Sequence, residues 1–332
     1  MGWVGTVIAA AQRQGIDANT LLAAAGIPFA ELQRERWPID HITRLWRAAE
    51  HCSGDPAFGL KAGAGVSPAS VSAVSFALQS APTLREAMSM VQKYQRLISD
   101  GGRFQILSGE SASWVVYHPR QGELAFSPYQ IEAVLAAAVT LSGWISGNAL
   151  KPLRVQFSQA QLAAYKEYQK VFACPVDFEQ AFSGLLVDNS VLDSPLPQAN
   201  PDLARVHEQF SAARLAELSL NSVSVPELRR WLHARISRQL PRRAEAASAL
   251  GISERTLARR LQEQGQTFDG LLDDVRREMA LQAVAETSRA LADIAQTLGF
   301  AESSTFYRAF RRWTGMPPAR WRRRESAVQP RR

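Results

Sequence analysis

The spacing of apolar residues along the chain predicts a helical start. Over most of the first 100 residues they recur every three or four positions, which is the repeat of an amphipathic helix. The pattern predicts helices over 3–14 and 18–25 and a third helix capped by Asp40. A Thr-x-x-Glu capping box predicts that a fourth helix begins after Thr83.

After about residue 100, the repeat of the apolar residues shortens to that of β-strands, in which every second side chain lies on the same face. Residues 103–107 and 113–117 predict a β-hairpin around a Ser-Gly-Glu-Ser turn. The later expected elements are a long apolar helix at 128–145, strands at 153–157, 176–178 and 185–187, and helices at 159–168 and 202–218. Helices that come first and then mix with strands indicate an α+β domain, which we place at residues 1–215.

Beyond residue 215 the strand pattern disappears. We expect a linker over 216–223, an all-α domain over 224–323 and a basic tail over 324–332. Ser224 is the predicted N-cap of the first helix of this domain. The tail would either contact phosphate groups non-specifically or remain solvated.

The all-α domain contains an internal repeat. Residues 247–254, Ala-Ser-Ala-Leu-Gly-Ile-Ser-Glu, recur 48 positions later at 295–302 as Ala-Gln-Thr-Leu-Gly-Phe-Ala-Glu. Each copy has the pattern of a helix, a tight turn at the shared glycine and a second helix, which is a helix-turn-helix. We place the first copy at about 244–264 and the second copy at about 291–313.

The second helix of each copy has a predicted buried side and an outward side. Ser253 would cap this helix in the first copy. The buried positions are four residues apart, Leu257 with Leu261 and Phe306 with Phe310. The residues between them are mainly Arg, Ser, Thr and Tyr, and such side chains can form hydrogen bonds with base edges in the major groove of DNA.

Positive charge is concentrated in this last third. Residues 1–220 contain 17 Lys and Arg against 19 Asp and Glu, whereas residues 221–332 contain 21 Arg, no Lys and 12 acidic residues. The net charge of +7 therefore divides into −2 and +9. A basic domain behind a near-neutral one points to a polyanionic partner.

From 223 to 322 the chain closely resembles the AraC/XylS family of bacterial transcription regulators. The most specific segments are Leu291–Phe300 and Phe306–Pro318, which include an aromatic pair and a Gly-x-x-Pro ending. The resemblance implies two helix-turn-helix copies held by a long linking helix, here 268–285. Their second helices would enter successive major grooves, about 34 Å apart on one face of the DNA.

The resemblance also implies which side chains contact DNA. The base-reading residues would be Arg255, Thr256, Arg259, Ser303, Ser304, Thr305, Tyr307 and Arg308. The residues that contact the DNA backbone would be Ser253, Arg260, Arg311 and Arg312. The second copy has one arginine fewer near its tip, so we expect it to position the protein more than it specifies sequence.

The first domain resembles the arabinose-binding-like type of N-terminal domain found in the AraC branch of ornithine- and arginine-responsive regulators. The resemblance lies in segments 17–28, 54–60, 80–87 and 172–178. It implies a domain that senses a small molecule, dimerises, or both. Five aromatic residues flank the hairpin and the long helix and would either line an apolar ligand pocket or form ordinary core: Trp114, Tyr117, Phe126, Tyr129 and Trp144.

Several other chemistries find little support in the sequence. Two cysteines, Cys52 and Cys174, exclude a disulfide framework and a cysteine-based zinc cluster, so we expect no metal, no cofactor and no catalytic residue. Cys174 is expected to be a small buried residue. No apolar run reaches the length of a membrane span, and a cytoplasmic location is expected.

The sequence therefore predicts a sequence-specific DNA-binding regulator, more often an activator in this family. Its expected partners are double-stranded DNA, a second copy of the chain in a homodimer, RNA polymerase and a small-molecule effector of unknown identity, with no membrane. One alternative is a regulator whose N-terminal domain only dimerises or docks a protein partner. Another is a DNA-acting repair enzyme, which would need a reactive cysteine.

Overall fold

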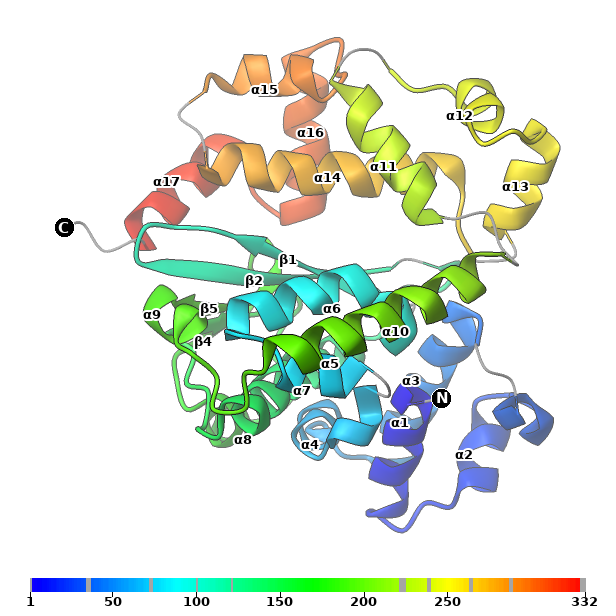
Figure 1. Cartoon of the computed structure of the whole chain (residues 1–332), viewed down its shortest axis with the longest axis vertical. Coiled ribbons are helices and arrows are strands. Elements are labelled where there is room, and N and C mark those ends of the chain that lie inside the picture. Colours follow the sequence, from blue (N-terminus) through cyan, green and yellow to red (C-terminus); the bar gives the residue numbers. More distant parts are fainter. Residues whose placement is uncertain are drawn as a thin grey trace. The chain divides into compact units, whose positions relative to one another are not determined.

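The chain forms two compact units. The computed structural model describes residues 2–33, 37–71, 74–99, 101–120, 122–220, 225–237, 240–262, 265–286 and 289–328. The first unit comprises Met1–Ile106 and Ala112–Glu217 and mixes helices with one sheet, and we call it the N-terminal unit. The second comprises Leu107–Ser111 and Leu218–Arg332, and from Leu218 onward its described elements are all helices; we call this part the C-terminal unit (Figure 1). The predicted fold class, α+β followed by all-α, is confirmed.

Helices make up most of the N-terminal unit. They are α1 (Gly2–Gln12), α2 (Ala18–Ala24), α3 (Ile39–Ser53), α4 (Phe58–Ala64), α5 (Val74–Gln79), α6 (Leu84–Ile98), α7 (Pro128–Ser146), α8 (Tyr165–Phe172), α9 (Asn189–Asp193) and α10 (Pro201–Leu220), with short 3-10 turns at Phe29–Gln33 and Pro68–Val71. The predicted cap of α6 is present, because Thr83 accepts the backbone N–H of Glu86. Helix α2 is capped by Asp17, which accepts the backbone N–H groups of Asn19 and Thr20 and which the sequence pattern did not predict.

One five-stranded sheet lies among these helices. Its strands are β1 (Gly102–Leu107), β2 (Ala112–Pro119), β3 (Arg154–Gln156), β4 (Val176–Asp177) and β5 (Ser183–Asp188), in the order β1-β2-β5-β3-β4. β5 pairs antiparallel with both β2 and β3, whereas β3 and β4 are parallel. Parallel strands need a crossover connection, and α8 lies within the segment that provides it. All the predicted strands are present, with small differences at their ends.

Two local predictions are wrong. Asp40 does not cap α3, because the helix begins at Ile39 behind Pro38. The Asp40 carboxylate instead accepts backbone N–H bonds from Glu123 at 3.2 Å and from Leu124 at 3.0 Å. It therefore fixes the loop before α7, a long-range role that local sequence does not reveal.

The helix predicted at 159–168 begins six residues later, at Tyr165. The hydroxyl of Tyr168 accepts the backbone N–H groups of Leu162 at 3.1 Å and of Ala163 at 3.3 Å. These two backbone amides thus find their hydrogen-bond acceptor in a side chain of α8, so they do not need acceptors within a helix. The segment before α8 is held as a loop for this reason.

Helix α7 joins two clusters of buried residues. Leu135 and Ala136 belong to the main core between the sheet, α6 and α7, whereas Ala133 and Ala137 belong to a second cluster around Trp46 on α3. Two glycines on α4 allow it to approach α7 closely. A Cβ on Gly59 would lie 2.3 Å from the carbonyl oxygen of Tyr129, and one on Gly63 would lie 2.2 Å from that of Ala133.

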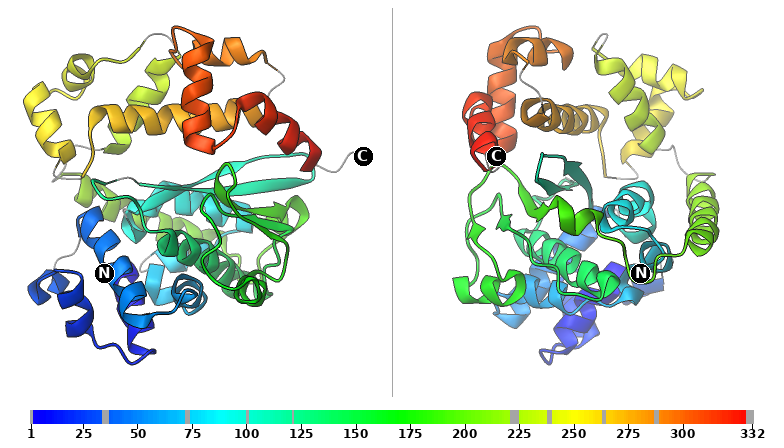
Figure 2. Two further views of the ribbon diagram at one scale, coloured as in Figure 1. Left: turned by 180° about the vertical axis from the view of Figure 1, so that it is seen from behind. Right: turned by 60° about the vertical axis from the view of Figure 1, so that its left-hand side comes forward.

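The C-terminal unit is built on one long helix. Its helices are α11 (Val225–Ile236), α12 (Arg243–Ala249), α13 (Glu254–Gln262), α14 (Phe268–Glu286), α15 (Leu291–Thr297), α16 (Ser303–Thr314) and α17 (Pro318–Val328). Figure 2 shows α12 and α13 near one end of α14, and α15, α16 and α17 toward the other. The long linking helix expected at 268–285 is α14.

The predicted boundary between the domains remains a prediction. Helix α10 continues to Leu220, into the segment that we expected to be a linker. Residues 221–223 of that linker and the expected cap Ser224 lie outside the described residues, as do residues 329–332 of the tail. Within the described part of the chain, no helix has the length and apolar character needed to cross a membrane.

Gly63→Ala should lower the free energy of unfolding by about 1–3 kcal/mol, because the added methyl group meets backbone atoms of α7 that cannot move aside easily. Chemical denaturation measures this change. Gly5→Ala is the matched control, since nothing lies within 4 Å of its Cβ position in α1. The control should be neutral or stabilising by less than about 1 kcal/mol. Equal effects of the two substitutions would contradict the close packing of α4 on α7.

Candidate nucleic-acid interface

The two sequence repeats fold into the same turn. Gly251 has a φ of 66° and Gly299 has a φ of 72°, both in the left-handed region. The residue after each glycine donates its N–H to the equivalent carbonyl of the first helix: Ile252 to Ala247 and Phe300 to Ala295, each at 3.0 Å. The predicted pair of helix-turn-helix elements is therefore present, formed by α12 with α13 and by α15 with α16.

The predicted buried positions of α13 and α16 are confirmed. Leu257, Leu261, Phe306 and Phe310 are all at most 1% exposed. In the second copy the rings of Phe306 and Phe310 pack edge-on, with their centroids 5.7 Å apart. Because these residues fix one side of each helix inward, the opposite side must face away from the core.

The side chains predicted to read bases lie on that outward side. Arg255 and Arg259 on α13 are exposed, and Thr256 is half-buried. On α16 the exposed residues of this set are Ser304, Thr305, Tyr307 and Arg308, and Ser303 is half-buried. Each of the two helices thus has one outward polar face. On α16, Arg308 donates a hydrogen bond to the hydroxyl of Thr305 at 3.3 Å.

The predicted backbone-contacting residues have different surroundings. The hydroxyl of Ser253 accepts the N–H of Thr256 at 3.1 Å, which confirms its capping role. Arg260 is half-buried and Arg311 is exposed. Arg312 forms an ion pair with Asp273 of α14, with N–O distances of 2.8 and 2.9 Å.

Helix α14 holds the second copy by two side chains that the sequence analysis did not single out. Arg276 donates from Nε to the carbonyl of Leu298 at 3.1 Å and from Nη2 to that of Gly299 at 3.0 Å. Its guanidinium carbon also lies 4.7 Å from the centre of the Phe300 ring. One arginine therefore binds both carbonyls of the turn and the aromatic residue that follows it.

Asp273 lies one helical turn before Arg276, and its carboxylate binds two side chains of α16. Besides the ion pair with Arg312, its carboxylate accepts the indole N–H of Trp313 at 2.8 Å. Residues three apart lie on the same side of a helix, so both side chains reach the second copy together. Burial of the guanidinium lowers the pKa of Arg276 from its usual value, as expected for a cation packed under the turn.

The first copy is held differently. Helix α11 packs against α14 and carries Arg229, which forms an ion pair with Glu278 of α14. Within the copy, Arg243 of α12 pairs with Glu254 of α13 at 2.9 Å, and both side chains are about half exposed. An exposed pair of this kind contributes about 0–1 kcal/mol, so the apolar contacts carry most of the stability.

Comparison with known proteins identifies both parts of the chain. Residues 15–196 match the arabinose-binding N-terminal domain of AraC transcription regulators, and residues 246–324 match a helix-turn-helix domain. The chain belongs to the AraC family of transcription regulators. Its two helix-turn-helix copies are therefore the DNA-binding part of a transcription regulator, and this family is not a family of enzymes.

The chain is similar to several known regulators. The ornithine utilization regulator of Pseudomonas aeruginosa is 32% identical over 319 residues, which cover 93% of this chain and 91% of that protein. The regulator VirS of Mycobacterium tuberculosis is 29% identical over 201 residues, 59% of this chain and 58% of that one. The crystal structure of the regulator CdpR from Pseudomonas aeruginosa is 23% identical, with a TM-score of 0.46 over 92% of this chain and 96% of that chain.

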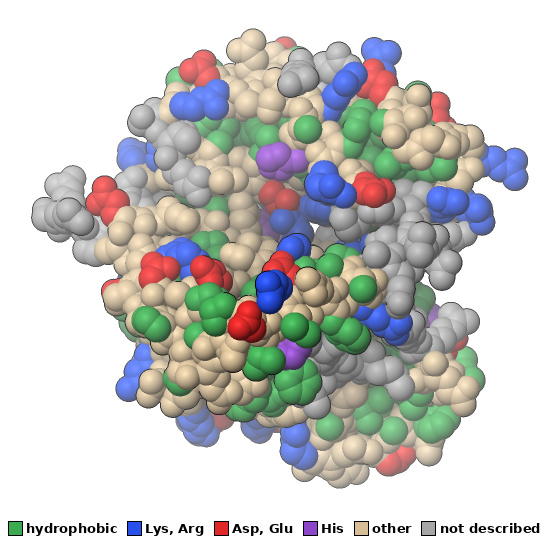
Figure 3. All heavy atoms as spheres, viewed as in Figure 1, with side chains coloured by type: hydrophobic (Ala, Val, Ile, Leu, Met, Phe, Trp, Pro, Cys, Tyr) green, Lys and Arg blue, Asp and Glu red, His purple; other side chains and the backbone are tan. Residues whose placement is uncertain are grey.

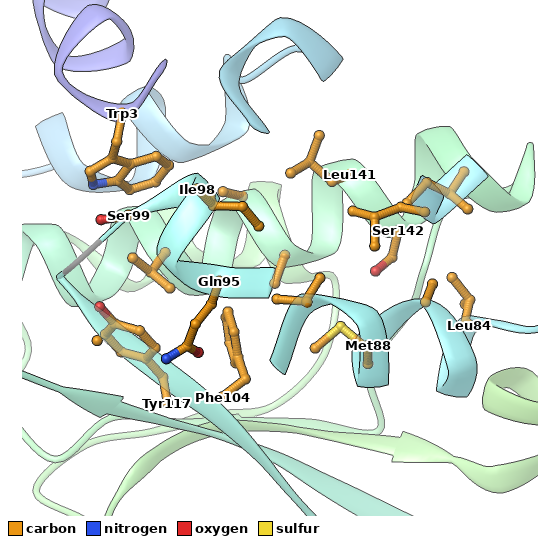
Figure 4. Close-up of a pocket in the computed structure, with 18 residues that line it drawn as sticks. Trp3, Leu84, Met88, Gln95, Ile98, Ser99, Phe104, Tyr117, Leu141 and Ser142 are labelled. Atoms are coloured by element: carbon orange, nitrogen blue, oxygen red, sulfur yellow. The ribbon is translucent and has the colours of Figure 1, made fainter. Parts of the chain in front are cut away.

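The N-terminal unit of this AraC-family chain contains a cavity of about 110 Å³. It lies among α6, α7 and the β1–β2 hairpin, with Trp3 of α1 at one side (Figure 4). Of the five aromatic residues predicted either to line a pocket or to form core, only Tyr117 lines it. Trp114 is buried in the core, and Trp144 is 42% exposed.

Cys174 has the environment of a structural residue. It is 8% exposed, and burial raises the pKa of its thiol to about 11. Reactive cysteines have a lowered pKa, so this thiol does not suit the alternative of a DNA-acting repair enzyme. Among the described residues, no group of three or more His, Cys, Asp or Glu side chains is placed to hold a metal ion.

Arg276→Met should loosen the turn of the second copy, because two buried carbonyls lose their donors. We expect faster native-state hydrogen exchange in peptides spanning 291–302, by a factor that corresponds to about 1–3 kcal/mol. Peptides from the first copy are the internal reference, and Arg320→Met, an exposed arginine on α17, is the matched control variant. Unchanged exchange over 291–302 would contradict this role of Arg276.

Proposed function

We propose that this protein is a transcription activator that binds a specific site on double-stranded DNA through both helix-turn-helix copies. The observation that supports it is the pair of outward polar faces on α13 and α16, in two copies that α14 joins. Each copy would place its second helix in a major groove, and the two grooves would be successive ones about 34 Å apart. RNA polymerase is the proposed partner in activation.

The exposed arginines have separate proposed roles. Arg255 and Arg259 lie within the first two turns of α13, where a guanidinium can reach the O6 and N7 atoms of guanine. Thr256 and the residues Ser303, Ser304, Thr305, Tyr307 and Arg308 complete the base-reading set. Hydroxyl groups are less selective among bases than a guanidinium, and four of the five hydroxyl side chains of this set lie in the second copy, which supports a stronger reading of sequence by the first copy.

Contacts to the DNA backbone are proposed for Ser253, Arg260, Arg311 and Arg312. The exposed Arg311 can approach a phosphate group directly. Arg312 would have to share its guanidinium with Asp273 or exchange that ion pair for a phosphate. The pair is solvent-accessible, so this exchange has a small cost.

The N-terminal unit is proposed to control DNA binding in response to a small molecule. The name of the Pseudomonas aeruginosa relative refers to ornithine utilization, which places that regulator in small-molecule metabolism. In this chain α6 lines the cavity and is tied to α10 by Lys93, whose ammonium lies 2.5 Å from the carboxylate of Glu208. A ligand that shifts α6 would thereby act on α10, the helix that leads out of the unit.

The alternative, in which the N-terminal unit only dimerises or docks a protein, also has a supporting observation. Leu203, Val206 and Phe210 on α10 are 49–58% exposed, and Phe76 on α5 is 59% exposed. Figure 3 shows hydrophobic side chains gathered on the face over α5 and α10. A second copy of the chain is the proposed occupant, and dimerisation is compatible with control by a ligand.

Footprinting of purified protein on DNA upstream of its own gene should protect two groove segments about one helical turn apart per protomer. Arg259→Ala should then cost about 1–3 kcal/mol on the preferred site and relax the preference at one base pair. Competition binding against sites with single base changes measures both effects.

Arg311→Ala is the matched comparison, because it should weaken specific and unrelated DNA equally and reduce the salt dependence of binding. If Arg259→Ala also weakens every sequence equally, Arg259 contacts phosphate and does not read a base. If the full chain protects no DNA at all, the proposed function is wrong.

Phe210→Glu should convert dimer into monomer, since a charge replaces an apolar side chain that is 58% exposed on the face over α5 and α10. Sedimentation velocity at micromolar concentration measures the change. Arg205→Glu on the same helix is the control for the added charge, with 71% of the Arg205 side chain exposed. A dimer that survives Phe210→Glu unchanged must form through another surface.

A further inference from the structure

The cavity in the N-terminal unit is apolar and lacks charged groups. The eighteen described residues that line it include no Asp, Glu, Lys, Arg or His. Ala87 on α6, Ala137 and Ala138 on α7, and Gly102 at the start of β1 are small residues that leave the space between these elements. Three aromatic side chains, Trp3, Phe104 and Tyr117, form part of the wall (Figure 4).

A few polar atoms of the wall have unused hydrogen-bonding capacity. The Oε1 atom of Gln95 and the indole N–H of Trp3 are buried without a hydrogen-bond partner among the described residues. Figure 4 shows the Gln95 amide beside Phe104 and near Tyr117, with Leu141 and Ser142 contributed by α7. Unpaired buried polar atoms are costly, so a ligand that bonds with one of them gains affinity and orientation.

The volume of about 110 Å³ limits the size of a ligand. An engineered apolar cavity of about 150 Å³ in another protein holds one benzene molecule. The cavity of this chain is smaller than that, so a single aromatic ring is the upper limit of its size. A ring with a small substituent requires the flexible side chains of Met88 or Gln95, which line the cavity, to move outward.

We propose that the effector of this regulator is an uncharged monocyclic aromatic molecule with one hydroxyl group, bound in this cavity. The ring packs against the aromatic and aliphatic wall, and the hydroxyl donates a hydrogen bond to Oε1 of Gln95. The phenol of Tyr117 stays neutral, because burial raises its pKa far above the usual value. The proposal rests on the proposed control of DNA binding by a small molecule.

The same chemistry argues against a basic amino acid such as ornithine. Ornithine carries two ammonium groups and a carboxylate at neutral pH, and each would need an opposite charge or several hydrogen bonds when buried. The described walls of the cavity offer no ionisable partner except the neutral phenol of Tyr117. Ligand specificity in this chain is thus expected to differ from what the name of its Pseudomonas relative suggests.

Calorimetry on the full chain without DNA tests the ligand class directly. The probes are 4-methylphenol, toluene, which is the same molecule without the hydroxyl, and L-ornithine. We expect 4-methylphenol to bind at least fivefold more tightly than toluene and ornithine not to bind. Binding of ornithine with no binding of 4-methylphenol would overturn the proposal.

Two variants locate the site. Ala138→Leu fills the cavity from α7 and should weaken 4-methylphenol at least tenfold, whereas Ala213→Leu on the exposed side of α10 should not. Gln95→Leu should weaken 4-methylphenol about five- to tenfold but leave toluene unchanged, and Gln12→Leu, an exposed glutamine at the end of α1, is its control. Far-ultraviolet circular dichroism checks that each variant is folded. Unchanged binding in both Ala138→Leu and Gln95→Leu would place the ligand elsewhere.

The failure of this proposal is distinguishable from failure of the proposed function. If the chain binds its DNA site but none of the aromatic probes, the ligand assignment is wrong and the regulator remains. If 4-methylphenol binds the cavity but changes neither DNA affinity nor transcription, the cavity binds the class of ligand proposed here and the control of DNA binding is wrong.

Discussion

Two side chains on one turn of α14 set the geometry of the second helix-turn-helix copy. Arg276 binds the carbonyls of Leu298 and Gly299 and lies over Phe300, while Asp273 binds Arg312 and Trp313. A helix is a stiff rod, so bonds made from one of its faces transmit its position to the turn and to α16 at once. The proposed binding to two successive grooves would depend on this rigidity, because DNA presents its grooves at a fixed repeat.

The two helix-turn-helix copies have the same internal geometry, but different contacts hold them in the C-terminal unit. Both turns have a glycine in the left-handed region and equivalent backbone hydrogen bonds. The second copy is held by α14 directly, whereas the first is reached through α11 and the ion pair between Arg229 and Glu278. This difference accompanies a difference in composition, since the first copy presents Arg255 and Arg259 and the second mainly hydroxyl side chains. This difference is the basis for proposing that the first copy reads sequence more strongly than the second.

Much of the fold could be predicted because its causes are local. The capping residues Thr83 and Ser253, the hairpin strands and the buried positions Leu257 and Phe306 follow from periodicity and turn chemistry. The predictions that were wrong depend on groups outside the local sequence pattern. Asp40 bonds to backbone more than 80 residues away, and the start of α8 depends on a hydroxyl that takes up the preceding amides. The lining of the cavity was also missed, because only packing decides which aromatic side chains leave space and which fill it.

The sequence by itself determined the family, the two-part organisation and the pair of DNA-binding motifs, because these depend on residue types at short, regular spacings. The repeated glycine, the apolar positions beside it and the arginines between them carry that information without reference to the rest of the chain. Only the tertiary structure decided how the motifs are held and where a small molecule can fit. Arg276, Asp273 and the small residues around the cavity have no local signature, since their roles arise from groups brought together by folding.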